Sequence, residues 1–339
     1  MNLNTIWFFL LGALLAGYAV LDGFDLGVGI LHPLARTDRE RRLFINAIGP
    51  IWDGNEVWLI TFGGALFAAF PFAYASIFSG FYVAFMALLF ALIFRAVSIE
   101  FRSKRNSPVW RRLWDWGFFG SSLLASFLFG AAVGNSMIGI PLDELGTFHG
   151  SIVDLLNPYA LMSGLTVSFM FAMHGALYLF MKIPRGELQN RVRDWMWHTW
   201  GMFLVLYVLG SMYTLVAIPR VTANLARHPW VAVVVVINVL AVANIPRSVF
   251  RDKALQAFMS SSVTIIALVT LFGMALWPNL VTASNDPANS LTIYNAASSQ
   301  KTLGIMFVIA LIGMPFVLIY TIIVYRTFRG RVELNDHSY

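Results

Sequence analysis

Carboxylic acids interrupt two apolar stretches of this 339-residue chain, where they could bind or transfer protons. Asp22 and Asp25 lie in the stretch YAVLDGFDLGVGIL. Asp53 and Glu56 lie in the stretch IWDGNEVWLITFGG. The members of each pair are three residues apart, so their carboxylates share one face of a helix. The sequence therefore predicts two helices that each carry a pair of acids.

A basic residue, Arg95, stands in a third apolar stretch, FALIFRAVSIEF. A charge in the centre of a spanning helix costs about 2.5 to 3.5 kcal/mol on insertion scales, so such residues usually face protein or water and mark ion or proton paths. Three neighbouring helices would thus bring charge to one depth in the membrane. We expect a proton path or buried charge cluster formed by Asp22, Asp25, Asp53, Glu56 and Arg95, supported by Trp52 and Asn55.

Simpler roles stay open for these residues. Asp22 and Asp25 would also suit a structural ion pair, or the interface if their helix lies shallower than expected. Glu56 is close to the start of its helix, where the macrodipole favours an acid by about 0.3 to 1 kcal/mol. Arg95 has a side chain long enough to reach toward the lipid headgroups. Packing alone, however, requires no acid at any of these positions.

The elements that must hold these residues are apolar helices. Hydrophobic residues make up 58% of the chain and charged residues 12%, a composition typical of an all-α integral membrane protein. The chain has no cysteine, which excludes disulfides and cysteine-held metal, iron–sulfur or c-type haem sites. The net charge of +6 comes from short basic groups between apolar runs, a topological pattern rather than one of nucleic-acid binding.

Nine stretches approach the length of about 20 apolar residues that a spanning helix needs. They form a single polytopic membrane domain, residues 1–339, with no soluble domain between them. The expected helices lie near residues 5–31, 51–71, 74–97, 116–140, 158–181, 195–218, 230–245, 255–278 and 302–325.

The distribution of lysine and arginine predicts the orientation of these helices. Of the 23 such residues, nineteen fall in alternate connections and at the C-terminal end, and only Arg220, Arg227 and Lys301 fall in the others. Basic residues concentrate on the cytoplasmic side of membrane proteins. We therefore expect the N-terminus outside and the C-terminus in the cytoplasm.

Histidines are scarce in the apolar stretches. His174 is the only one deep inside a predicted helix, whereas the others fall in loops, at helix edges or in the tail. A pair of axial haem ligands needs two side chains that project into one cavity, and methionines in a membrane bundle more often serve packing. We expect no haem ligand and no metal site in this chain.

Several motifs together resemble one family, subunit II of the cytochrome bd-type quinol oxidases. They are YAVLDGFDLGVGIL, IGPIWDGNEVWLITFGGALFAAFP followed by SGFYVAF, the pair FR at Arg95, EFRSK, WDWGFF, LLNPYALMSG and SLTIYNAASSQKTLGIM. They run from the first predicted helix to the ninth. The resemblance implies nine helices, arranged as two four-helix bundles plus one peripheral helix. Asp25, Asp53, Trp52 and Arg95 match positions of the family motifs, and Asp22 and Asn55 flank them.

The resemblance also implies a function in the bacterial cytoplasmic membrane. In this family a complex with a related subunit I oxidises quinol at the outer side and reduces oxygen to water with protons from the cytoplasm, which generates a proton gradient. Two b-type haems and one d-type haem belong to subunit I. Subunit II would then stabilise that partner and share a proton path, some members hold a structural quinone against it, and small single-helix subunits can join the complex. The segment 220–229 is short where some members have a long insertion, which leaves the subgroup open.

Two other classes of function remain to be weighed against the oxidase. A proton-coupled secondary transporter would also need intramembrane charges, but it should show internal repeats and helices broken at the midplane, which we do not find. A purely structural membrane partner would need no proton path. An oxidase subunit should copurify with a haem-bearing partner, whereas a transporter should purify colourless.

Overall fold

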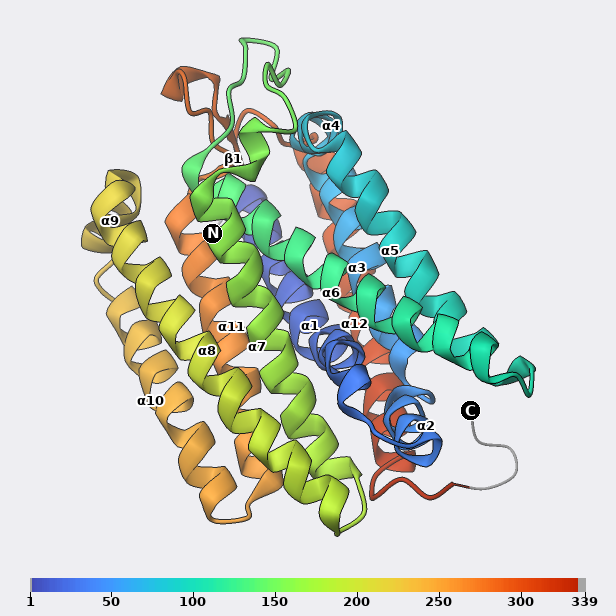
Figure 1. The fold of residues 1–339 in the computed structure, drawn as a ribbon. Coiled ribbons are helices and arrows are strands. Elements are labelled where there is room, and N and C mark those ends of the chain that lie inside the picture. Colours follow the sequence, from blue (N-terminus) through green and yellow to red (C-terminus); the bar gives the residue numbers. More distant parts are fainter. Residues whose placement is uncertain (1, 335–339) are drawn as a thin grey trace.

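The computed structural model describes residues 2–334 and is almost entirely helical (Figure 1). The α-helices are α1 (Leu3–Leu31), α2 (Asp38–Ile48), α3 (Trp52–Ala69), α4 (Pro71–Gly80), α5 (Tyr82–Phe101), α6 (Pro108–Ile138), α7 (Pro158–Lys182), α8 (Glu187–Ala217), α9 (Pro219–Arg227), α10 (Val231–Phe250), α11 (Ala254–Leu276) and α12 (Gln300–Thr327). Short 3₁₀ turns are η1 (His32–Leu34), η2 (Arg102–Lys104), η3 (Asp154–Leu156) and η4 (Pro287–Asn289). Strands β1 (Asn279–Val281) and β2 (Leu291–Thr292) pair antiparallel.

Within the described residues, eight helical segments are long and apolar enough to cross a membrane. They correspond to eight of the nine predicted spans and confirm a multi-pass, all-helical membrane protein. The remaining prediction, residues 51–71, is the helix α3, which is too polar for this criterion because Asp53, Asn55 and Glu56 occupy its first turns. The count of nine spans therefore stays a prediction.

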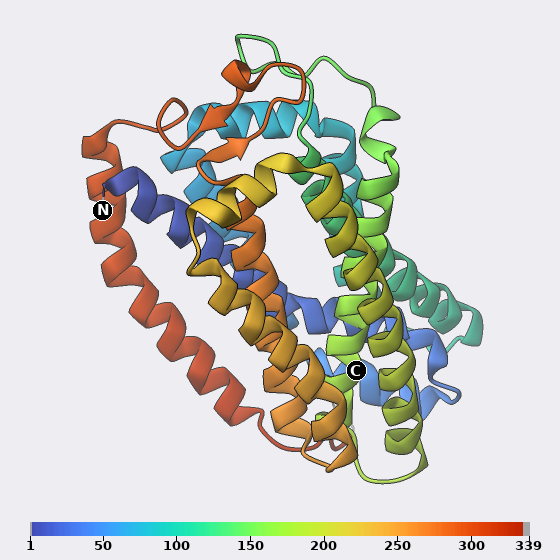
Figure 2. The same cartoon turned by 90° about the vertical axis from the view of Figure 1, so that its left-hand side faces the viewer.

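The third predicted span, residues 74–97, was wrong in its outline because the chain forms two helices there. Helix α4 ends at Gly80, and α5 begins at Tyr82 after a single non-helical residue, Phe81. Figures 1 and 2 show α4 lying across one end of the molecule while α5 runs along its side. Glycine favours such a break because it is a poor helix former, and the turn lets α4 bury Ala73 and Ser76 beneath the loops at that end.

Helix α1 is the centre of the packing, with α3, α6, α7 and α11 around it. Its contact with α7 is made nearly backbone to backbone: a Cβ atom added at Gly27 would lie 1.9 Å from the carbonyl oxygen of Phe171 and 2.9 Å from the Cα of Gly175. One turn earlier, Gly23 faces the ring of Phe171. Gly23 and Gly27 form a GxxxG pattern, which therefore serves close helix packing, as small residues do in membrane bundles.

The two ends of the molecule differ in their chemistry. One end carries α4, α9, the two strands and the loop of residues 139–157, and the opposite end carries α2, the α7–α8 and α10–α11 connections and the last turn of α12 (Figures 1 and 2). The basic groups of α2 and of these two connections thus gather at one end, which matches the alternation seen in the sequence. The expected cytoplasmic C-terminus, Tyr339, lies outside the described residues.

Candidate functional site

Arg95 of α5 is the centre of a buried ion-pair cluster. Its Nη2 donates a hydrogen bond of 2.8 Å to Asp22 Oδ1 on α1 and a second bond to Glu56 Oε1 on α3. Arg95 and Asp22 are both fully buried, whereas the side chain of Glu56 keeps 23% of its surface exposed. Three helices are therefore joined by one guanidinium group, and each charge offsets the desolvation of the others.

Asp25 lies on the same face of α1 but pairs with an amide rather than with Arg95. Asn55 Nδ2 donates to Asp25 Oδ2 over 2.7 Å and to the carbonyl oxygen of Leu21 over 3.1 Å. The Tyr325 hydroxyl of α12 donates to Asn55 Oδ1 over 2.9 Å. The second oxygen of Asp25, Oδ1, is buried and has no hydrogen-bond partner among the described residues. Asp25 is thus a buried carboxyl group that no cationic side chain in the described part of the chain contacts directly.

Asp53 is exposed, in contrast to the other predicted site residues of α3. In the part of the chain that the structure describes, its carboxylate makes no hydrogen bond or ion pair, although Trp52 beside it is buried. Helix α1 continues for six residues beyond Asp25, and α5 for six beyond Arg95, which is about 9 Å of helix. The first turn of α3 therefore lies well inside the ends of its neighbours.

The structure thus brings together most of the predicted cluster in two adjoining parts. Asp22, Glu56 and Arg95 form the ion-pair cluster, and Asp25 and Asn55 form a carboxyl–amide pair beside it. For Asp22, this geometry matches the ion-pair alternative. The carboxylate of Glu56 contacts Arg95, and the N-terminus of α3 has no side-chain cap, so Glu56 does not cap this helix.

A second buried charge cluster was missed by the sequence analysis. Asp115 of α6 accepts hydrogen bonds from Arg102 Nε at 2.6 Å and Arg41 Nη1 at 3.0 Å, and its Oδ1 lies 2.7 Å from His32 Nε2. Arg102 also donates to Asp38 over 2.7 Å. The cluster joins η1, α2, η2 and α6. One signal was available, since Asp115 is the only acid between Glu100 and Asp143, in a segment rich in arginine.

His174 of α7 is fully buried, and both of its ring nitrogens are engaged. Nδ1 lies 2.7 Å from Ser261 Oγ, and Nε2 lies 3.0 Å from the carbonyl oxygen of Val20. The ring also stacks on Phe258 with centroids 4.6 Å apart. These contacts suit a structural histidine, and the described residues hold no group of three or more His, Asp or Glu placed to bind a metal ion.

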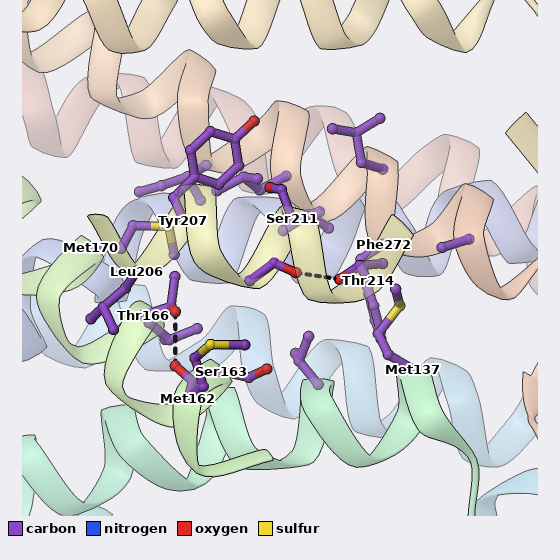
Figure 3. Close-up of a pocket in the computed structure, with 18 of the residues that line it drawn as sticks. Met137, Met162, Ser163, Thr166, Met170, Leu206, Tyr207, Ser211, Thr214 and Phe272 are labelled. Atoms are coloured by element: carbon purple, nitrogen blue, oxygen red, sulfur yellow. Dashed lines mark hydrogen bonds between the residues drawn. The ribbon is translucent and has the colours of Figure 1, made fainter. Parts of the chain in front are cut away.

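An apolar cavity of about 390 Å³ lies between α1, α6, α7, α8 and α11, with α9 and α10 at its edge. Figure 3 shows Met137, Met162, Met170, Leu206 and Phe272 on its walls. The hydroxyl of Thr166 bonds the carbonyl oxygen of Met162, and that of Thr214 bonds Tyr159, so these polar groups are satisfied within the wall. Tyr18 also lines the cavity, and its buried hydroxyl has no partner among the described residues. The cavity suits an apolar molecule with few polar groups.

Comparison with known proteins agrees with this architecture. Residues 3–328 match the family model described as cytochrome bd terminal oxidase subunit II. The chain is 38% identical to the cytochrome bd-I ubiquinol oxidase subunit 2 of Escherichia coli K12, covering 99% of this chain and 98% of that one. It is 34% identical to the cytochrome bd ubiquinol oxidase subunit 2 of Bacillus subtilis, with 99% and 98% covered.

The fold is likewise shared with a solved structure, described as bd oxidase from Geobacillus thermodenitrificans. The TM-score is 0.81 at 16% sequence identity, with 97% of this chain and 99% of that chain covered. At this identity the likeness concerns the fold alone, whereas the sequence matches establish descent. The chain belongs to the cytochrome bd terminal oxidase subunit II family.

Proposed function

We propose that this chain is the haem-free subunit of a respiratory quinol oxidase that oxidises quinol and reduces oxygen to water. Membership of the subunit II family makes it part of such an oxidoreductase complex, in the bacterial cytoplasmic membrane. The more specific role, a share in the proton path, rests on Asp25, a buried acid that no cation of residues 2–334 contacts directly. Family membership accounts for the intramembrane charges, so no observation favours the transporter alternative.

The haems of the complex, two of b type and one of d type, would be held by the partner, subunit I. His174 is the only histidine deep in a described span, and its two ring nitrogens already contact Ser261 and Val20. These contacts leave no ring nitrogen of His174 free for a haem, which supports placing the haems in subunit I. The partner set would be subunit I, quinol and membrane lipid, with one or more small single-helix subunits.

Protons for oxygen reduction would enter from the cytoplasm on the side of α2. This assignment rests on the basic groups, nineteen of 23 lysines and arginines, in the connections and terminal segment expected on that side. A reporter fused after Tyr339 should be active only in its cytoplasmic form, and one inserted near Asp286 only in its external form. The opposite pattern would invert the assignment.

Asp53 and Asp25 would form this chain's part of the proton path. Asp53 is exposed in the first turn of α3, and Asn55 of the same turn holds Asp25, which has one oxygen unpaired in the described part of the chain. A carboxyl group is able to accept and release a proton at neutral pH when its surroundings stabilise both forms. The ion pairs of Arg95 with Asp22 and Glu56 would hold α1, α3 and α5 together beside this route. Oxygen reduction would draw protons from it.

Subunit I would dock on the exposed face of α3, and α3 would be the ninth span. Asp53, Val57, Ile60 and Gly64 follow one another on this face. A Cβ added at Gly64 would meet no atom within 4 Å, so there is space for a close helix neighbour. A carboxylate facing lipid is costly, whereas one facing a protein partner can be hydrogen-bonded. The interface would thus stabilise subunit I and cover Asp53.

The apolar cavity would hold the structural quinone expected for some members of the family. Its walls are methionine, leucine and phenylalanine, which suit an isoprenoid tail, and Tyr18 and Tyr207 provide hydroxyl groups for a polar head. The quinone there would fill space between helices and would stabilise their packing. It would not be the quinol that is oxidised at the outer side of the complex.

Purification through a tag on this chain tests the assignment. We expect a haem-bearing partner to copurify and the preparation to show both b-type and d-type absorption bands. A colourless preparation that contains this chain alone, from cells that express the whole complex, would contradict the proposal. Asp53→Asn should keep both sets of bands and lower the rate of oxygen consumption per haem.

A further inference from the structure

The cytoplasmic half of α12 is joined to the bundle by a hydrogen bond between residues that are far apart in the sequence, Tyr325 and Asn55. Every residue from Pro315 to Tyr320 is exposed, so this stretch of the helix is little covered by the other elements within residues 2–334. Figure 2 shows α12 running along the edge of the molecule, apart from most of the other helices. Pro315 also removes one backbone donor from the middle of the helix, which favours a bend between the two halves.

The two ends of α12 are tied to the bundle by hydrogen bonds. At the outer end, Trp7 Nε1 donates to the carbonyl oxygen of Leu303 over 3.0 Å. At the other end, the Tyr325 hydroxyl donates to Asn55 Oδ1 over 2.9 Å, and Lys182 Nζ donates to the carbonyl oxygen of Phe328 over 2.6 Å. Only the contact of Tyr325, among the described bonds of α12, leads directly to a residue that touches Asp25.

The hydroxyl of Tyr325 completes the hydrogen bonds that hold the Asn55 amide against Asp25. Both hydrogens of Asn55 Nδ2 are used, one by Asp25 Oδ2 and one by the carbonyl oxygen of Leu21. A turned amide would place its oxygen against the Asp25 carboxyl group and the carbonyl oxygen of Leu21, which can only accept. The hydroxyl of Tyr325 therefore supports the observed orientation and holds the amide in place from its oxygen side. Tyr325 donates to Oδ1, so every polar atom of the Asn55 side chain has a hydrogen-bond partner when its NH₂ group faces Asp25.

We infer that Tyr325 is a positioning residue for proton transfer through Asp25, acting by way of the Asn55 amide. The inference rests on the proposed role of Asp25 and deepens it, since it places the peripheral helix α12 in control of that acid. Tyr325 transfers no proton itself, because an amide stands between it and the carboxyl group. The charged groups around Asp25 are Asp22 on α1, Glu56 on α3 and Arg95 on α5. The nearby hydroxyl of Tyr178 on α7 donates its hydrogen bond to the carbonyl oxygen of Ala47.

The test uses Tyr325→Phe in the purified complex, which removes the hydroxyl and keeps the ring. Tyr320→Phe is the matched control, because Tyr320 lies on the same helix, is 62% exposed and makes no hydrogen bond through its hydroxyl within the described residues. A net hydrogen bond is worth about 0.5 to 1.5 kcal/mol, which corresponds to about a two- to tenfold change in rate. We expect kcat of quinol-driven oxygen consumption per haem to fall by that factor in Tyr325→Phe only, with KM for quinol unchanged.

A double-mutant cycle separates positioning from a merely structural role. Asn55→Leu should slow turnover by itself, and adding Tyr325→Phe to it should cause no further fall. Three results would each overturn the inference. In the first, Tyr325→Phe turns over like Tyr320→Phe; in the second, the two falls in turnover multiply in the double variant. In the third, Tyr325→Phe loses assembled complex but keeps normal turnover per haem. If turnover is slow in Asp25→Asn but normal in Tyr325→Phe, only this inference fails. If turnover is normal in Asp25→Asn, the proposed proton role fails and the inference fails with it.

Discussion

Replacing Asp22 by asparagine should damage the assembly of the protein rather than its chemistry. Asp22 is fully buried and accepts a hydrogen bond of 2.8 Å from Arg95, which is itself fully buried. Removing one member of a buried ion pair costs about 3 to 5 kcal/mol, because the other charge stays desolvated. Glu56 still contacts Arg95, so we expect the lower end of that range, about 3 kcal/mol, for Asp22→Asn.

Glu56→Gln is the matched comparison, since it removes the other acid from the same guanidinium group. The Glu56 side chain keeps 23% of its surface exposed, whereas that of Asp22 keeps none. Partly exposed pairs are worth less, since solvent screens them, so Glu56→Gln should cost about 1 kcal/mol. A difference of about 2 kcal/mol between the variants corresponds to about a thirtyfold difference in the equilibrium between folded and unfolded protein.

The assay compares the haem content of complexes purified through the tag, their thermal stability, and oxygen consumption per haem. We expect Asp22→Asn to give the lowest yield and the lowest melting temperature, with near-normal turnover in the complexes that do assemble. An Asp22→Asn complex that assembles in full and melts with the wild type would refute the buried ion pair. Equal damage by Glu56→Gln would refute the argument from exposure.

Three further variants test other parts of the structure. Asp115→Asn should lower the yield of assembled complex far more than Asp38→Asn, because Asp115 is buried against Arg102 and His32 while the Asp38 side chain is 45% exposed; similar yields would contradict this. Gly27→Ala should cost about 1 to 3 kcal/mol in stability by forcing α1 from α7, whereas Gly12→Ala, with no atom within 4 Å of its new Cβ, should be nearly neutral in thermal melting. His174→Ala should leave every haem absorption band of the assembled complex, and the loss of one band would show that this chain supplies a ligand.

Most of the correct predictions about the fold and the site came from patterns among residues close in the sequence. The spacing of Asp22 and Asp25 and the position of Arg95 were sufficient to expect charges at one depth, and apolar length located eight spans. Both patterns are local, since they depend on helix periodicity and on the thickness of the membrane. Helix α3 does not meet the hydropathy criterion for a span, because the polar residues that form its part of the site lower its mean hydropathy.

Contacts between distant segments could not be read in the same way. Tyr325 and Asn55 are 270 positions apart, and nothing near either residue indicates the other. Asp115 stood between two tryptophans, in a pattern typical of an interface belt, and its partners come from three other segments. The cavity depends on how side chains of several helices fail to fill the space between them. Such features follow from the tertiary packing and not from any single stretch.

The most direct test of the proposed function is the turnover of Asp25→Asn. The amide keeps the size of the side chain and retains an oxygen that can accept the 2.7 Å hydrogen bond from Asn55, but it cannot exchange a proton at neutral pH. The measurement is quinol-driven oxygen consumption per assembled haem, recorded with the optical spectrum of the same preparation. We expect normal haem bands and a turnover reduced by about a hundredfold or more, the range typical of a lost acid–base group. Normal turnover per haem in Asp25→Asn would contradict it.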